Sequence, residues 1–211
     1  AVSVDGVAVG GCGGNSDAWH TEGDTLEVAD RENLERDIHV YVEAVVRLAT
    51  TPFLPFDYRA TVAEIEEAVR HYAGAAGGAF DVEPVLEECR CLVRSLDSFY
   101  RAAEDAVREC GDADHPPEVW PLLHSYDRLQ LALARELVPI AYCRRRYFHD
   151  PALETPAVPD LAPLRDWASL AEDRDGRGFL LAELTRGRNR VVDGLKRARE
   201  RLRSVSGGAL T

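Results

Sequence analysis

Residues 82–110 read VEPVLEECRCLVRSLDSFYRAAEDAVREC, and this stretch decides the fold of the chain. Its apolar side chains recur every three or four residues, at Leu86, Cys89, Val93, Leu96, Tyr100, Ala103 and Val107. This period predicts one amphipathic helix with a single buried stripe. At about 1.5 Å per residue the helix would be roughly 40 Å long. It therefore needs other long helices to cover its stripe.

The helical pattern continues on the C-terminal side. A turn at 112–117 ends in Pro117, which suits the start of a helix from about Glu118, and Pro139 should kink or end that helix. Prolines between 147 and 163 predict an extended ordered loop. A final helix is expected from about Gly178 to Ser204. The apolar residues expected to face inward are Leu122, Tyr126, Leu129, Leu133 and Leu137 in the first helix and Leu181, Leu184, Val191, Leu195, Ala198 and Leu202 in the second.

Two more helices are predicted on the N-terminal side. Asp30 can cap a helix that ends near Ala49, and Asp57 can cap another after the break at Pro52 and Pro55. The glycines that follow the second helix should end it. In the first helix, one face carries Leu34, Ile38, Tyr41, Val42, Val45 and Leu48.

The first 25 residues differ in character. Residues 1–10, AVSVDGVAVG, have the pattern of a short strand or tight hairpin, and residues 10–25 form a glycine-rich loop without apolar periodicity. The sequence thus predicts a mainly α fold, in which a short N-terminal strand and a glycine-rich loop precede an antiparallel helical bundle of four long helices. We expect one unit at 1–29 and a helical domain at 30–211.

Composition narrows the classes of partner. The 37 acidic and 25 basic residues give a net charge of −12, which would repel nucleic acid and an anionic membrane surface. No apolar run approaches the roughly 18 residues that span a bilayer, so we expect a soluble product. The five cysteines lack C-x-x-C spacing, so neither a disulfide framework nor a cysteine zinc site is indicated. The chain begins with alanine and lacks methionine, so we expect a segment upstream, and its compartment stays open.

The stretch with chemical content is Asn15-Ser16-Asp17-Ala18-Trp19-His20-Thr21-Glu22-Gly23-Asp24-Thr25. It resembles the end of the catalytic domain in the zinc exopeptidases that include aminopeptidases, glutamate carboxypeptidase and the catalytically inactive transferrin receptor. That family has an aromatic residue, a zinc-ligand histidine, a small hydroxyl residue, two variable positions, then Asp or Glu with Thr. A second similarity is Leu54-Pro55-Phe56-Asp57, at the family's break between two helices. Looser similarities follow at 131–135 and 147–149.

The resemblance implies roles for individual residues. His20 would be a metal ligand, on a site loop with Trp19, Thr21 and Thr25. Zinc accepts imidazole nitrogen, and the other ring nitrogen needs a hydrogen-bond acceptor that fixes the tautomer. Asp24 is the first candidate for that acceptor and Asp17 the second. Taken alone, a loop histidine is an ordinary solvated side chain, and either aspartate could simply form an Asx turn.

The resemblance also implies what these residues lack. A second histidine, a bridging aspartate, another acidic ligand and a glutamate general base would all lie upstream, in an α/β zinc-peptidase domain. The chain supplies no catalytic residue and at most one ligand to a site of one or two zinc ions, so the 211 residues alone should be inactive.

Three functions remain open from the sequence. The first is the C-terminal part of a zinc-dependent aminopeptidase or carboxypeptidase that hydrolyses a terminal peptide bond through metal-activated water, with a peptide or amino-acyl substrate. Its helical domain would pair two subunits through the third and last helices. The second is a non-catalytic dimerisation module of the transferrin-receptor type. The third is a scaffold unrelated to peptidases.

Other polar residues have simpler interpretations. His39 and His71 fall on helices and are expected at the surface, and the spacing of His115 and His124 carries no metal signal. The run 144–146 consists of three arginines. It is most simply a solvated cluster, although it could receive a carboxylate.

Overall fold

The computed structural model describes residues 2–4, 7–9, 21–23, 25–109, 119–143, 156–170 and 174–206. The chain divides into two compact units, Ala1–Thr51 and Pro52–Thr211. The sequence predicts a boundary after residue 29, and the second compact unit of the structure begins at Pro52. The first long helix therefore belongs to the first unit by its contacts.

The first unit contains short elements and one long helix. Strands β1 (Val2–Val4) and β2 (Val7–Val9) pair antiparallel, and a 3-10 turn η1 (Leu26–Val28) precedes α1 (Arg31–Thr50). The carboxylate of Asp30 accepts a hydrogen bond from the backbone N–H of Asn33 at 2.9 Å, as expected of a helix cap.

The predicted apolar face of α1 is not covered within its unit. The helix has no buried residue, and the side chains of Leu34, Tyr41 and Val45 are 56%, 74% and 62% exposed. The sequence predicts that this stripe packs into the bundle, and the contacts within the first unit provide no cover for it. Amphipathic period decides which residues share a face, but it carries no information on what covers that face.

The second unit is a bundle of four α-helices with one long connection. The helices are α2 (Tyr58–Ala75), α3 (Glu83–Glu109), α4 (Trp120–Tyr142) and α5 (Arg174–Ser206), and a 3-10 segment η2 (Ala162–Leu170) precedes α5. The turn between α2 and α3 uses Gly77 and Gly78 at φ +60° and +77°, a region that glycine enters without steric cost. A mainly α bundle is thus present, as the sequence predicts.

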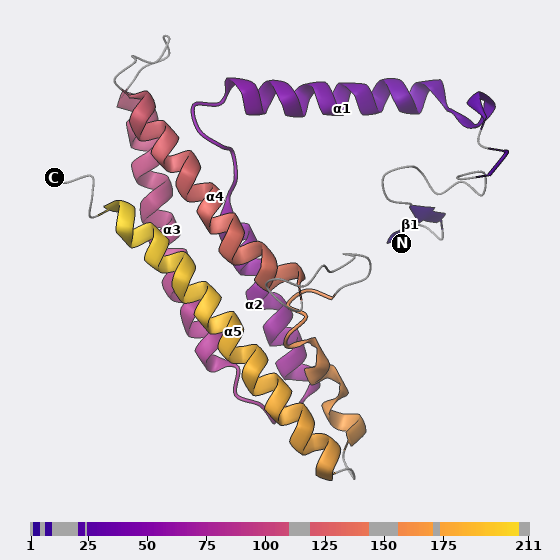
Figure 1. Cartoon of the computed structure of the whole chain (residues 1–211), viewed down its shortest axis with the longest axis vertical. Helices are drawn as coiled ribbons and strands as arrows, with labels where there is room; N and C mark the ends of the chain where they lie inside the picture. The colour runs from indigo at the N-terminus through magenta and orange to yellow at the C-terminus, as the bar shows by residue number, and fades with distance from the viewer. Residues whose placement is uncertain are drawn as a thin grey trace. The chain divides into compact units, whose positions relative to one another are not determined.

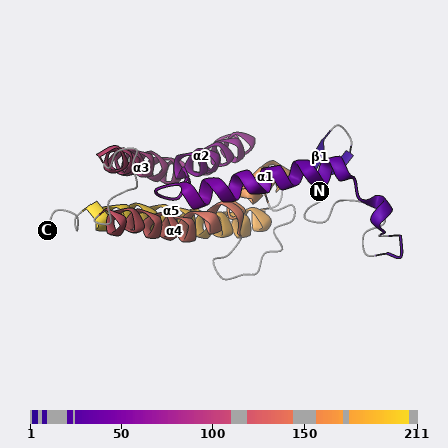
Figure 2. The same ribbon diagram turned by 90° about the horizontal axis from the view of Figure 1, so that it is seen from above.

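The four helices form two layers (Figures 1 and 2). In Figure 2, α2 and α3 make one layer and α4 and α5 the other. Each layer is an antiparallel pair. Across the layers, α3 packs on α5 and α2 packs on α4. The helices α3 and α5 run parallel, because Asp81, just before α3, pairs with Arg188, and Glu88, further along α3, pairs with Arg199, further along α5. The described part of the connection, residues 156–170, lies toward the end of the bundle at which α4 ends and α5 begins, as Figure 1 shows.

The core lies between the two layers. Val62, Leu92, Leu96, Leu133 and Leu195 are among its fully buried side chains. Two inward assignments were wrong, because Leu122 is 36% and Leu181 is 44% exposed. In each case the adjacent leucine is buried instead, Leu123 at 0% and Leu180 at 8% exposure, so the buried stripe passes one residue away from the predicted position.

Helix boundaries also depart from expectation. The helix α4 runs through Pro139 to Tyr142 instead of ending, and α5 begins at Arg174, four residues before Gly178. Residues 162–170 form the 3-10 segment η2 where an extended loop was expected up to 163. A proline removes one backbone N–H but does not prevent a helix when tertiary packing holds the turn.

The connection before η2 is held against the bundle. Val158 is fully buried at φ +48°, an unusual value for a β-branched residue, and its N–H donates to the carbonyl of Ala141 at 2.9 Å. The Tyr72 hydroxyl donates to the carbonyl of Ala157 at 2.5 Å. None of the helices in the described ranges combines the length and apolar composition needed to cross a bilayer.

Candidate functional site

The sequence-predicted metal ligand His20 lies outside the described residues, as do Asp17, Trp19 and Asp24. Thr21 and Thr25 are described and exposed. The N–H of Gly23 donates to the Thr21 hydroxyl at 3.2 Å, and the N–H of Thr25 donates to the carbonyl of Gly23 at 2.9 Å. Both hydrogen bonds lie just before η1. Within the described parts of the chain, no group of three or more His, Cys, Asp or Glu side chains is placed to hold a metal ion.

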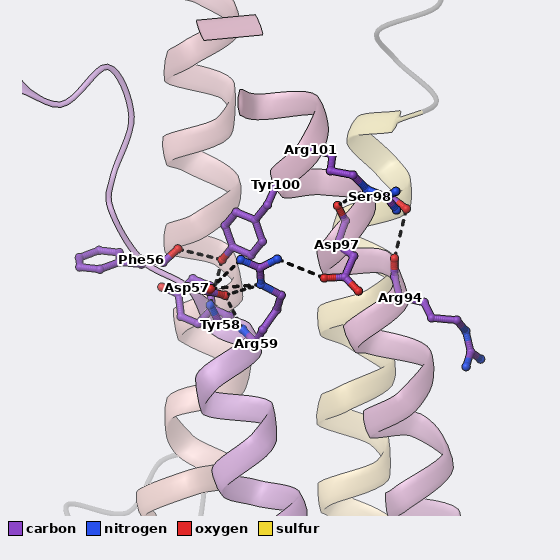
Figure 3. Close-up of polar contacts among 9 residues, drawn as sticks. All are labelled: Phe56, Asp57, Tyr58, Arg59, Arg94, Asp97, Ser98, Tyr100 and Arg101. Atoms are coloured by element: carbon purple, nitrogen blue, oxygen red, sulfur yellow. Dashed lines mark hydrogen bonds and ion pairs between the residues drawn. The ribbon is translucent and has the colours of Figure 1, made fainter. Parts of the chain in front are cut away.

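The second motif, Leu54-Pro55-Phe56-Asp57, is described completely, and it lies where the chain enters the bundle (Figure 3). Pro52, just before the motif, and Pro55, within it, each fix the backbone φ angle and together remove two N–H donors. The N–H of Leu54 donates to the carboxylate of Asp127 on α4 at 2.8 Å. The connector is therefore tied to α4 at one end by a backbone hydrogen bond.

Tyr100 of α3 ties the other end. Its hydroxyl donates to the carbonyl of Phe56 at 2.8 Å and accepts from the N–H of Tyr58 at 2.9 Å. Tyr58 is the first residue of α2, and its N–H has no partner within the helix. One buried hydroxyl thus satisfies two backbone groups, and burial raises the pKa of Tyr100 to about 12.

An ion-pair chain covers this hydrogen-bond pair from outside. Arg59 contacts both carboxylate oxygens of Asp57 at 2.9 and 2.7 Å and reaches Asp97 of α3 at 3.2 Å. Its guanidinium also lies over the ring of Tyr100, 4.8 Å from the ring centre. The hydrogen bond from Arg59 lowers the pKa of Asp57, and Asp57 followed by Asp97 raises the pKa of Arg59.

This arrangement holds the connector in place and leaves no polar group of the cluster available for catalysis. Every polar group that Figure 3 shows between the connector and α3 already has a partner, so none is placed as a general base or nucleophile. Asp57 caps α2 through the N–H of Arg59 at 2.9 Å, as the sequence predicts. Sequence reasoning missed Tyr100, Asp97 and Asp127 as partners of the motif, because they lie on other helices and nothing in their local spacing indicates the connector.

A second polar cluster lies between α4, α5 and the connection before η2. It surrounds a recess of about 180 Å³ whose apolar side is formed by Pro139, Ile140 and Val191. The carboxylate of Glu136 is 2% exposed and is paired with Arg197 at 2.7 Å and Arg201 at 3.3 Å. Sequence reasoning missed Glu136 because it occupies a buried position on a helix otherwise lined with leucine.

The same recess holds a bidentate pair. Arg190 donates to both oxygens of Asp160 at 2.8 and 2.6 Å, and Asp160 raises the pKa of Arg190. Asp193 pairs with Arg197. Each carboxylate that lines the recess therefore has a guanidinium partner, and the pairs join α4 and the connection to α5.

The remaining sequence-predicted polar residues are separate from both clusters. His39 and His71 are exposed on α1 and α2, and His124 is exposed on α4 beside the Trp120 ring, with centroids 5.8 Å apart. His115 and the arginines 144–146 lie outside the described residues. No protein-family model, curated protein or solved structure matches the chain.

Proposed function

We propose that the chain is the C-terminal part of a zinc-dependent exopeptidase, in which the loop around His20 contributes one metal ligand and the α2–α5 bundle is a subunit-pairing module. The observation that carries the proposal is the order of two motifs: Trp19-His20-Thr21 with Asp24-Thr25, then Leu54-Pro55-Phe56-Asp57. The second motif begins a separate compact unit at Pro52, which supports a junction between a catalytic part and a helical module.

The residues of the loop suit zinc in kind. Zinc accepts imidazole and carboxylate ligands. This chain would provide fewer than the three or four protein ligands that one zinc site requires. The chemistry that zinc supplies in such enzymes is activation of a water molecule and polarisation of the scissile carbonyl. One ring nitrogen of His20 would bind the metal, and the N–H of the other ring nitrogen would donate a hydrogen bond to the carboxylate of Asp24.

The test needs the longer protein with its upstream part. His20→Ala should remove zinc and nearly all hydrolysis of a terminal peptide bond, while Asp24→Asn should cost about 10- to 100-fold if Asp24 only orients the imidazole. His39→Ala is the matched control, because His39 is an exposed helix histidine in the same unit. Equal zinc content and activity in the His20 and His39 variants would eliminate the ligand role of His20.

Pairing of two subunits is supported by the outer face of α4. Leu131, Val138 and Tyr142 are 46%, 45% and 47% exposed, and they recur at intervals of seven and four residues. On described α3, by contrast, no large hydrophobic side chain is exposed, and on α5 the exposed ones are Phe179 and Leu181 near its start. This distribution favours α4 as the pairing helix over the third and last helices expected from the sequence.

The interaction module without catalysis is the second candidate. It is favoured by the same α4 face and by the absence of an open catalytic group around the Leu54–Asp57 connector. Metal analysis of the longer protein separates the two candidates. A protein that forms dimers but contains no zinc, even before mutation, would belong with the receptor-like members.

A further inference from the structure

The outer groove between α3 and α5 has a charge opposite to that of the chain as a whole. A recess of about 290 Å³ is lined by Cys91, Arg94, Ser95, Ser98, Arg199, Leu202 and Arg203. Three of these residues are arginines and none is acidic, although the whole chain has a net charge of −12. The recess is therefore a local positive site on an acidic protein.

Two of the three guanidiniums have no carboxylate partner in the described part of the chain. Arg94 donates to the sulfur of Cys91 at 3.2 Å, and no ion pair joins it or Arg203 to an acidic residue. Figure 3 shows Arg94 directed away from the Asp57–Arg59 cluster on α3. Eight other arginines in the described part of the bundle pair with carboxylates, whereas these two guanidiniums keep donors available beside the recess.

The third guanidinium is fixed in position. Arg199 pairs with Glu88 at 3.0 Å, and the side chains of the two residues are only 19% and 12% exposed. The Nε of Arg199 is buried and has no hydrogen-bond partner. Glu88 cancels one of the three positive charges of the lining. Glu87, which accepts a hydrogen bond from the Cys91 thiol at 3.5 Å, is itself paired with Arg90, so the recess keeps a net charge of about +2.

The hydroxyl groups complete the lining. Ser95 and Ser98 donate to the carbonyls of Cys91 and Arg94 at 3.2 and 3.1 Å, one turn back along α3. Their protons can turn toward a ligand, because a serine hydroxyl rotates freely. Guanidinium forks match the oxygens of phosphate, and hydroxyls add single hydrogen bonds to the same group.

We propose that this recess between α3 and α5 binds a small phosphate-type anion, either inorganic phosphate or a phosphate monoester. Arg94 and Arg203 supply the charge that is unpaired, and Arg199 supplies a donor of fixed orientation. The site is independent of the zinc loop and of the pairing face of α4. Nucleic acid is a poor occupant, because the rest of the surface is acidic and would repel an extended polyanion.

The recess contains its own reporter in Cys91, which is half-buried, and the chain contains a matched control in Cys143, which is also half-buried. Cys143 lies in the other recess, where three arginines face three carboxylates. Iodoacetate is anionic and iodoacetamide is neutral, and the thiolate displaces iodide from both. The ratio of the two products at each cysteine, measured by peptide mass spectrometry, reports the local charge.

We expect the carboxymethyl to carboxamidomethyl ratio to be higher at Cys91 than at Cys143. One unit charge about 6 Å away in water changes the rate about threefold. Inorganic phosphate at millimolar concentration should lower the ratio at Cys91 and leave Cys143 unchanged, and Arg203→Ala should do the same without phosphate. Arg70→Ala, which removes an exposed arginine of α2 paired with Glu66, should have no effect.

Calorimetric titration of the full chain gives the affinity. Saturable binding of phosphate should weaken about tenfold in Arg94→Ala and in Arg203→Ala, as expected for loss of one charge-assisted hydrogen bond. A phosphate monoester such as phosphoserine distinguishes the two sources, since only a monoester site binds it more tightly than inorganic phosphate. Equal ratios at Cys91 and Cys143, or equal weakening by Arg70→Ala, would overturn the proposal.

Discussion

Removing the hydroxyl of Tyr100 tests whether the Leu54–Asp57 motif is an anchor. Tyr100→Phe keeps the ring, which is 5% exposed and packs on Phe99 with centroids 5.0 Å apart, and deletes the oxygen that serves the carbonyl of Phe56 and the N–H of Tyr58. Leaving a buried polar group without a partner costs about 1–3 kcal/mol. Because the connector can partly rehydrate, we expect a loss of about 2 kcal/mol.

The assay is urea unfolding of the full chain followed by helical circular dichroism. With a slope of about 2 kcal/mol per molar urea, the midpoint should fall by about 1 M. Tyr126→Phe is the matched control: Tyr126 is 8% exposed in the same aromatic cluster, against Phe99 at 5.5 Å, and its hydroxyl makes no hydrogen bond within the described residues. That variant should change stability by less than about 0.5 kcal/mol.

Alkaline pH gives an independent reading of the same group. Tyrosine ionises at pH 10.0 when unfolded, whereas burial holds the pKa of Tyr100 at about 12. Its contribution to stability is therefore complete below pH 10 and is lost as pH rises to 12, by about 1.4 kcal/mol per pH unit or roughly 2–3 kcal/mol in total. The stability gap between wild type and Tyr100→Phe should close over this range. Equal losses in Tyr100→Phe and Tyr126→Phe, or a gap independent of pH, would refute the anchoring role.

Three further perturbations follow from the packing of α5 and the face of α4. Gly187→Ala should destabilise the bundle by about 1–3 kcal/mol, because the new Cβ would lie 2.3 Å from the carbonyl oxygen of Asp160. A Cβ at Gly178, in the same helix, meets nothing within 4 Å, so Gly178→Ala should stabilise the bundle by about 0.5–1 kcal/mol. Thermal unfolding of the two variants tests this order. Glu136→Ala should lower stability by about 1–3 kcal/mol in chemical denaturation, less than a fully buried pair because Arg197 and Arg201 remain partly hydrated. Val138→Glu should abolish dimers in sedimentation velocity, and Phe179→Glu, on a side chain 79% exposed, should not.

The sequence predicts the helices of the bundle well, and the reasons are local. Asp30 and Asp57 both cap the helices expected of them, and Leu96, Leu133 and Leu195, which were predicted to face inward, are all buried. The ends of the helices were predicted less well. Pro139 lies within a packed turn of α4, and α5 begins four residues before Gly178. No residue pattern indicated that α3 and α5 would run parallel, since helix period fixes a face but not its neighbour.

The candidate site shows the same division between local and tertiary information. Motif order can identify His20 as a ligand candidate, because ligand type and loop composition are local. The partners of the Leu54–Asp57 connector could not be predicted in the same way: Asp97 and Tyr100 are about 40 residues away along the chain, and Asp127 about 70.

The two motifs therefore differ in what their residues must do. In the connector, the Leu54 N–H, the Phe56 carbonyl and the Asp57 carboxylate already have partners, so substitutions there should change the stability of the bundle before they change any activity. At His20 the opposite order is expected, because a ligand supplied from a glycine-rich loop contributes little to the packing of a bundle that begins at Pro52. Measuring zinc content and unfolding free energy on the same variants separates the roles: loss of metal with unchanged unfolding assigns a residue to the site, and loss of stability with unchanged metal assigns it to the anchor.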